Sequence, residues 1–145
     1  MNAHRSIRTL VAASLLVLGS AAHAATLTVM KSAACGCCAK WIEHVEKHGF
    51  TVKVVNVDDI MAVKAKAGIP DELASCHTTM VGGYVVEGHV PAADIKKLLT
   101  QKPKAKRIAV PGMPGGSPGM EHADKRPYQT LLVKADNSTS VFAQH

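Results

Sequence analysis

The segment KSAACGCC, residues 31–38, places three of the four cysteines of the chain within four positions. A β-prone run at 27–31 leads into it, which predicts a strand followed by a turn. Beyond the turn, apolar residues recur at the spacing of one helix face, at Cys38, Trp41, Ile42 and Val45. Three thiols in one turn are more than a single disulfide needs, and soft sulfur ligands are those that Cu(I) prefers. The segment therefore predicts a cluster of sulfur groups at the start of a helix.

After this segment, patterns typical of strands alternate along the chain with patterns typical of helices. Gly49 ends the first helix as a C′ residue, and Pro91 begins the last one. Gly82-Gly83 between two short apolar runs indicates a hairpin. The predicted strands are 27–31, 52–57, 78–81 and 84–87, and the predicted helices are 38–48, 60–67 and 91–101. This β-α-β-α-β-β-α order, with a C-x-x-C at the first helix, predicts a thioredoxin-like α/β domain at 25–101.

Residues 102–145 predict a C-terminal extension that packs on this domain. The stretch 110–121 holds three prolines and four glycines and is expected to be a loop. Residues 128–134 and 138–142 flank Asp136-Asn137 and predict a terminal hairpin. The extension is therefore a Pro/Gly/Met-rich loop followed by two strands.

The N-terminus predicts export. Residues 1–24 combine a positive start, an apolar run at 10–18 and the small-residue site Ala22-His23-Ala24, which is the pattern of a cleaved signal peptide. The apolar run is shorter than the ~20 residues that span a bilayer, so we expect no membrane span after cleavage. An exported chain meets oxidising conditions, in which disulfides form.

Charge and aromatic content argue against a nucleic-acid partner. The formal net charge is +6, but the basic residues are scattered. The exception is a group in a connector, which we expect to be solvated: Lys102, Lys104, Lys106 and Arg107. The chain holds one Trp, two Tyr and two Phe, which is a weak basis for stacking on bases.

The cysteines allow three kinds of site. A helix N-terminus favours the thiolate of Cys35, which suits both a metal ligand and a redox nucleophile with Cys38 as resolving thiol. Four cysteines allow three pairings, of which only Cys35–Cys38 with Cys37–Cys76 avoids a very tight ring. A metal site, a redox dithiol and a structural disulfide therefore stay open, with the metal site favoured.

Cys76 and His77 are the second candidate group. They precede the predicted hairpin, in the loop that faces the dithiol of thioredoxin-like folds, so we expect a fourth thiolate and an imidazole at the site. The alternative is a half-buried cysteine beside a surface histidine. His44 and His48, four residues apart on a solvated helix face, are expected to be bystanders.

A repeated Pro-Gly-Met triplet supplies the third group, at 111–113 and 118–120. Pro then Gly fits the centre of a type II turn, which presents the following methionine. The thioethers of Met113 and Met120, with the nearby His122, are candidate ligands for Cu(I). The alternative is an ordinary loop whose methionines cover apolar surface.

These motifs together resemble the CopG family of exported copper-resistance proteins. The matching segments cover nearly all of the chain after residue 24: Lys31-Ser32-Ala33-Ala34-Cys35-Gly36-Cys37-Cys38 with Trp41, Gly68-Ile69-Pro70, Ser75-Cys76-His77-Thr78, Gly83-Tyr84-Val85-Val86-Glu87-Gly88-His89-Val90-Pro91 and Val110-Pro111-Gly112-Met113-Pro114. The resemblance implies a thioredoxin-like domain with a C-terminal extension. It also implies a cysteine-bridged multinuclear copper site on the CxCC motif, with a role in copper handling or Cu(I)/Cu(II) interconversion in the periplasm.

Carried over to this chain, the resemblance assigns the family's cysteines to Cys35, Cys37, Cys38 and Cys76. His77, His89 and the first Pro-Gly-Met triplet match in sequence. We therefore expect a periplasmic copper-binding protein rather than a turnover enzyme, whose partners are copper ions and other periplasmic copper-handling proteins. The alternative function is thiol–disulfide exchange by the Cys35/Cys38 dithiol.

Overall fold

A computed structural model describes residues 24–145 of the chain. The signal peptide predicted at 1–24 lies outside the described residues, apart from its last position. No helix within 24–145 has the length and apolar character needed to cross a membrane.

The order of elements confirms the predicted thioredoxin-like arrangement and the predicted terminal hairpin, and it adds one strand, β5 (Arg107–Ala109), that was not predicted. The elements are β1 (Thr26–Lys31), α1 (Gly36–Lys47), β2 (Thr51–Asn56), α2 (Ile60–Lys66), the 3-10 helix η1 (Asp71–Leu73), β3 (Thr78–Val81), β4 (Tyr84–Glu87), α3 (Ala92–Gln101), β5 (Arg107–Ala109), β6 (Gln129–Val133) and β7 (Thr139–Gln144). Gly49, at φ +89°, follows the end of α1 in the left-handed conformation that glycine adopts readily. Asp59 begins α2 by accepting a hydrogen bond from the Ala62 amide at 3.0 Å.

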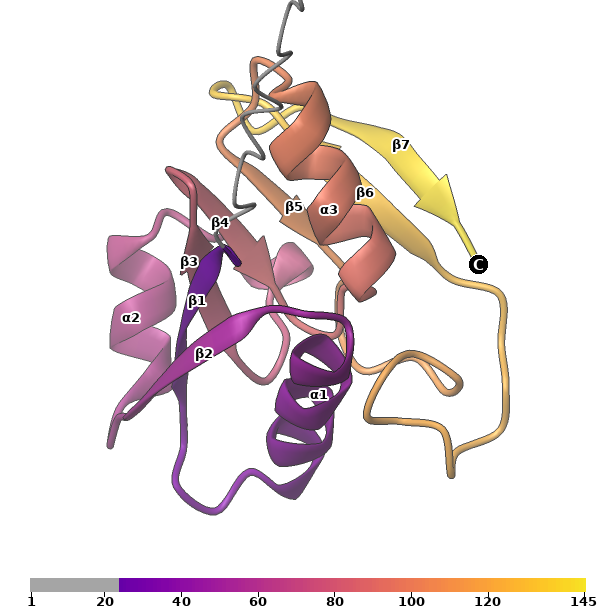
Figure 1. Ribbon diagram of the computed structural model, residues 1–145. Helices are drawn as coiled ribbons and strands as arrows, with labels where there is room; N and C mark the ends of the chain where they lie inside the picture. Colours follow the sequence, from indigo (N-terminus) through magenta and orange to yellow (C-terminus); the bar gives the residue numbers. More distant parts are fainter. Residues whose placement is uncertain (1–23) are drawn as a thin grey trace, which may run out of the picture.

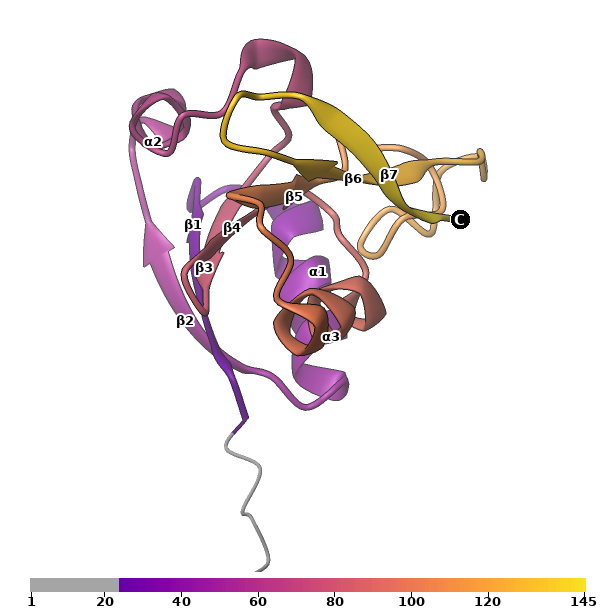
Figure 2. The same ribbon diagram turned by 90° about the horizontal axis from the view of Figure 1, so that it is seen from above.

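The seven strands found within residues 24–145 form one sheet in the order β2-β1-β3-β4-β5-β6-β7. The β1–β2 and β4–β5 pairs are parallel, and the remaining neighbours are antiparallel. Figures 1 and 2 show α1 and α3 on one face of this sheet and α2 on the other.

Two buried clusters fill the two faces of the sheet. The larger one joins α1 and α3 to the inner strands and includes Trp41, Ile95 and Val86. The smaller one, on the opposite face, includes Leu73 and Val85. Val85 and Val86 belong to different clusters because successive side chains of a strand point to opposite faces.

The basic group after α3 matches the sequence expectation at three of its four residues. Lys102, Lys104 and Lys106 are exposed, as predicted for a solvated stretch, but Arg107 begins β5 and is buried. Its Nη1 donates a hydrogen bond to Asn137 Oδ1, in the turn between β6 and β7, at 2.8 Å. This partner lies thirty residues away in the chain, and Arg107 Nε is buried without a hydrogen-bond partner among the described residues.

Candidate metal centre

The CxCC turn is built on the first residues of α1. Cys35 is the N-cap residue, and its Sγ accepts a hydrogen bond from the Cys38 amide at 3.3 Å. Cys35 and Cys38 are joined by a disulfide, whereas Cys37 and Cys76 are free thiols. Cys38 is buried with the apolar face of the helix, as the sequence predicts, and Cys37 is half-buried.

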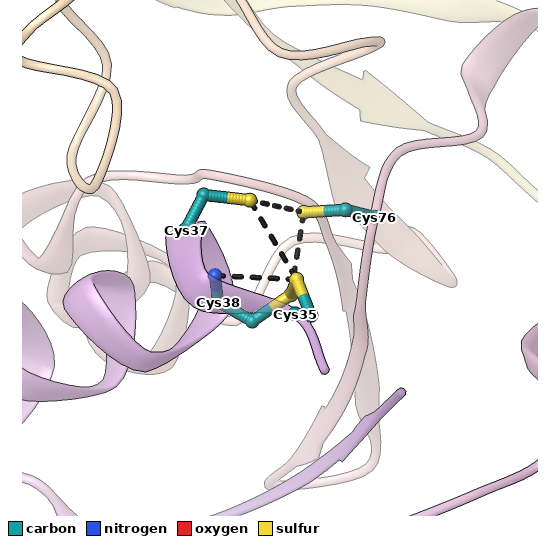
Figure 3. A group of neighbouring side chains, drawn as sticks. All are labelled: Cys35, Cys37, Cys38 and Cys76. Carbon is teal, nitrogen blue, oxygen red and sulfur yellow. Dashed lines mark hydrogen bonds between the residues drawn. A yellow bond between two sulfur atoms is a disulfide. The ribbon is translucent and has the colours of Figure 1, made fainter. Parts of the chain in front are cut away.

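Cys76 lies in the loop before β3 and faces the turn (Figure 3). Its Sγ is 3.5 Å from Cys38 Sγ and 3.7 Å from Cys37 Sγ, and Cys37 Sγ is 3.6 Å from Cys35 Sγ. All four sulfur atoms lie within 4.8 Å of one another. The structure therefore brings the four cysteines into one group that could hold a metal ion.

His89 is a neighbour of this group that our candidate ligand set omitted. Its Nε2 is 2.8 Å from Cys76 Sγ, and its Nδ1 is 2.7 Å from the carbonyl oxygen of Pro118. A carbonyl can only accept, so Nδ1 carries the proton and the lone pair of Nε2 faces the sulfur. This is the arrangement that orients a histidine for metal binding.

His77 is fully buried beside Cys76. Its Nδ1 is 3.3 Å from Cys76 Sγ, and its Nε2 is buried without a hydrogen-bond partner among the described residues. Its ring packs against Trp41, with the ring centroids 4.4 Å apart. A second possible ligand group, within 4.8 Å, consists of Cys76, His77 and His89.

Burial shifts the protonation of these groups. It lowers the pKa of His77 well below its ordinary value, assisted by nearby His89, and it also lowers the pKa of His89. Both imidazoles are therefore neutral at pH 7, the form that binds metals. Burial, together with neighbouring Cys37, raises the pKa of Cys76 to about 12, so a metal that binds Cys76 must displace its proton.

The two Pro-Gly-Met turns flank the site through their backbones. In the second, the Met120 amide donates to the Ser117 carbonyl at 2.8 Å, which closes a turn around Pro118 and Gly119. In the first, the Gly112 amide donates to the Ala74 carbonyl at 3.0 Å, close to the Cys76 loop. Each turn therefore contacts a segment that carries a sulfur or imidazole group of the site.

The three side chains of the extension that are predicted as ligands differ in how far they are exposed to solvent. Met113 is 51% exposed, Met120 is half-buried, and His122 is exposed. His122 belongs to neither ligand group found within 24–145. The second triplet contributes a backbone group to the site, because the carbonyl of Pro118 accepts the hydrogen bond from His89 Nδ1. Patterns of side chains in the sequence do not reveal such a backbone contact.

His44 and His48 stand apart from the two ligand groups. His44 is half-buried rather than solvated, and its Nε2 accepts a hydrogen bond from the amide of Ala92, at the start of α3, at 3.1 Å. His48 Nδ1 lies 2.7 Å from the carbonyl of His44. Both interactions give these histidines a structural explanation.

Comparisons with known proteins show which proteins this chain is similar to. Residues 73–120 match a family described as "Protein of unknown function, DUF411". A solved structure titled "Copper resistance protein copG- Form 2" is 43% identical, and the match covers 84% of this chain and 98% of that one with a TM-score of 0.80. A second, titled "Form 1", is 45% identical, and the match covers 83% and 96% with a TM-score of 0.77. No curated protein matches the chain. On the extent of this similarity, the chain belongs to the CopG family of copper resistance proteins.

Proposed function

We propose that the protein binds Cu(I) through the thiolates of Cys35, Cys37, Cys38 and Cys76, as a multinuclear cluster that serves copper resistance in the periplasm. The supporting observation is that all four sulfur atoms lie within 4.8 Å of one another. Thiolates are soft ligands that suit Cu(I), zinc and iron–sulfur clusters. The titles of the two similar structures, both copper resistance proteins, favour copper over zinc, which also binds four cysteines.

The contacts of Cys76 favour a cluster over a single ion. Its sulfur lies 3.5 Å from Cys38 and 3.7 Å from Cys37, so one thiolate can contact ions held by either. His77 and His89 offer neutral imidazoles on the other side of the same sulfur, at 3.3 Å and 2.8 Å. We propose both as ligands at the edge of the cluster, and retain Met113, Met120 and His122 as further proposed ligands.

Copper loading depends on the state of the Cys35–Cys38 pair. The disulfide between them leaves two free thiols, whereas its reduction by two electrons supplies all four thiolates. A thiol reductant must therefore precede loading of the complete site. Interconversion of Cu(I) and Cu(II) by the loaded protein is a further part of the proposal, for which imidazole ligands are suited to either oxidation state.

The alternative function is thiol–disulfide exchange. The Cys35–Cys38 disulfide at the start of α1 favours it, because this is the position at which a thiolate is stabilised by unpaired amides and the helix dipole. This function predicts that metal-free protein reduces or isomerises disulfide substrates, and that the activity survives loss of Cys37 and Cys76.

An anaerobic titration of the reduced protein with Cu(I), against a chromophoric Cu(I) chelator, tests the proposal. We expect several copper ions per chain in the wild type and fewer after Cys37→Ser, because that thiol is dispensable for a simple C-x-x-C dithiol. Copper retained at the same stoichiometry by the variant would refute the cluster. No retention by the wild type would favour the dithiol function instead.

A further inference from the structure

A buried ion pair lies directly beneath the loop that carries Cys76. Lys64 of α2 and Glu87 of β4 are 2% and 0% exposed, and the Lys64 ammonium donates to Glu87 Oε1 at 2.5 Å. Thr78 completes the group: its hydroxyl accepts from Lys64 at 3.1 Å and donates to Glu87 Oε2 at 2.7 Å. The proposed copper ligands do not include any of these three residues.

This group is bonded to the backbone on the N-terminal side of Cys76. Glu87 Oε1 also accepts a hydrogen bond from the Ser75 amide at 2.7 Å. On the other side of Cys76, the His77 carbonyl accepts from the Gly88 amide at 3.0 Å. Cys76 and His77 are thus held between two anchors, both supplied by the end of β4. His89 follows two residues after Glu87, so the same strand end also places the second imidazole.

Stability alone gives little reason for this arrangement. Replacing a buried ion pair by apolar residues of similar size is often neutral or stabilising, because two charges no longer need to be desolvated. An apolar residue at 87, however, would leave the Ser75 amide without its acceptor and free the loop to move. The carboxylate of Glu87 therefore fixes the backbone of the Cys76 loop through a hydrogen bond that an apolar side chain of the same size could not accept.

We propose that the Lys64–Glu87–Thr78 group is a positioning network, which holds Cys76 and His77 against the CxCC turn and thereby sets copper affinity. The inference rests on the proposed function for its copper part, but its geometric part holds without metal. Substituting groups that hold metal ligands in position typically changes metal affinity by about 10- to 100-fold.

Two double variants separate positioning from stability. Lys64→Met/Glu87→Gln removes both charges but keeps an oxygen for the Ser75 amide, and the Gln amide can donate to the Thr78 hydroxyl oxygen that Lys64 no longer contacts. Lys64→Met/Glu87→Leu is equally neutral but lacks that oxygen. Arg107→Met is the matched control, since it removes a buried cation whose partner, Asn137, lies in the β6–β7 turn.

Two quantities are measured on the folded variants. The first is Cu(I) affinity of the reduced full chain, by competition with a chelator. The second needs no metal: in a Cys35→Ser/Cys38→Ser background, equilibration with glutathione gives the effective concentration of the Cys37 and Cys76 thiols, whose sulfurs are 3.7 Å apart. We expect the Leu variant to lose about tenfold or more in both quantities, and the Gln variant and the control to stay within about threefold of wild type.

Unchanged values in the Leu variant would overturn the proposal. A lower effective concentration in a protein whose wild type does not bind Cu(I) would support the positioning network and refute the copper function. If the Leu variant does not fold, Thr78→Val decides, because it removes only the bridging hydroxyl. A several-fold loss in both quantities then supports the network, and wild-type values overturn it.

Discussion

Gly119, at the centre of the second Pro-Gly-Met turn, offers a sharp test of how the extension contacts the site. Its φ is +87°, and a Cβ there would lie 2.7 Å from the Cys37 carbonyl oxygen and 3.0 Å from the Trp41 amide. Both are backbone atoms of α1, which cannot yield as a flexible side chain does. Gly119→Ala should therefore force the turn away from the helix.

The cost can be separated into two parts. An L-residue in the left-handed region costs about 1–2 kcal/mol, and overpacking a tight contact typically adds about 1–3 kcal/mol. Gly112, in the first triplet, has φ +66° and no atom within 4 Å of its added Cβ, so Gly112→Ala should show the first part alone. We expect free energies of unfolding lowered by about 2–5 kcal/mol for Gly119→Ala and about 1–2 kcal/mol for Gly112→Ala.

The displaced turn should also weaken copper binding. Pro118 precedes Gly119, and its carbonyl oxygen lies 2.7 Å from His89 Nδ1. Loss of that hydrogen bond frees the ring that faces Cys76, for which we expect about a 10- to 100-fold loss of Cu(I) affinity. Urea unfolding of reduced, metal-free protein and chelator competition measure the two effects. Equal stability and equal copper affinity of the two alanine variants would refute the contact between turn and helix.

Three further predictions follow from the protonation and capping of the chain. The pKa values of His77 and His89 are below the ordinary value of 6.5, so the unfolded chain binds more protons than the folded one at acidic pH. The free energy of unfolding should therefore fall as pH drops below 6.5, by up to about 1.4 kcal/mol per pH unit for each histidine. Urea titrations of the metal-free protein at several pH values check this, and a flat profile would contradict it. Because the pKa of Cys76 is raised to about 12, Cu(I) affinity should increase with pH, about tenfold per unit for each thiol proton displaced, as measured by buffered competition titrations. Cys76→Ser should reduce that slope. Asp59→Ala should lower the free energy of unfolding by about 1 kcal/mol through loss of the α2 cap, without a change in copper affinity.

The parts of the fold that were predicted correctly depend on local patterns. The apolar spacing at Trp41 and Ile42 belongs to a single helix, and the strands beside Gly82-Gly83 belong to a single hairpin, so each could be identified within a few residues. The three cysteines of the CxCC turn lie together for the same reason. Cys76 is distant in sequence, and its approach to them was expected from the order of elements in the fold.

The buried polar residues could not be predicted in this way. Lys64, Glu87 and Arg107 belong to residue types that usually lie at the protein surface. Each of them is buried here and hydrogen-bonds to a residue of another element or turn. His89 was missed as a candidate ligand because the carbonyl that orients it belongs to Pro118, 29 residues further along the chain. Sequence periodicity carries no information about such pairs.

These buried polar groups have a consequence for the stability of the metal-free protein. Five fully or nearly fully buried side chains with an ammonium, carboxylate or imidazole group lie in or beside the site: Lys31, Lys64, His77, Glu87 and His89. Each must be desolvated on folding, and the unpaired Nε2 of His77 has no compensating hydrogen bond within the described residues. A ligand that binds only the folded protein stabilises it by about 2.7 kcal/mol when the free ligand concentration is a hundred times the Kd. Binding of the same ligand to the cysteines of the unfolded chain reduces this effect. Copper bound as we propose should therefore also stabilise the fold, since the buried imidazoles of His77 and His89 lie beside the proposed ligand Cys76.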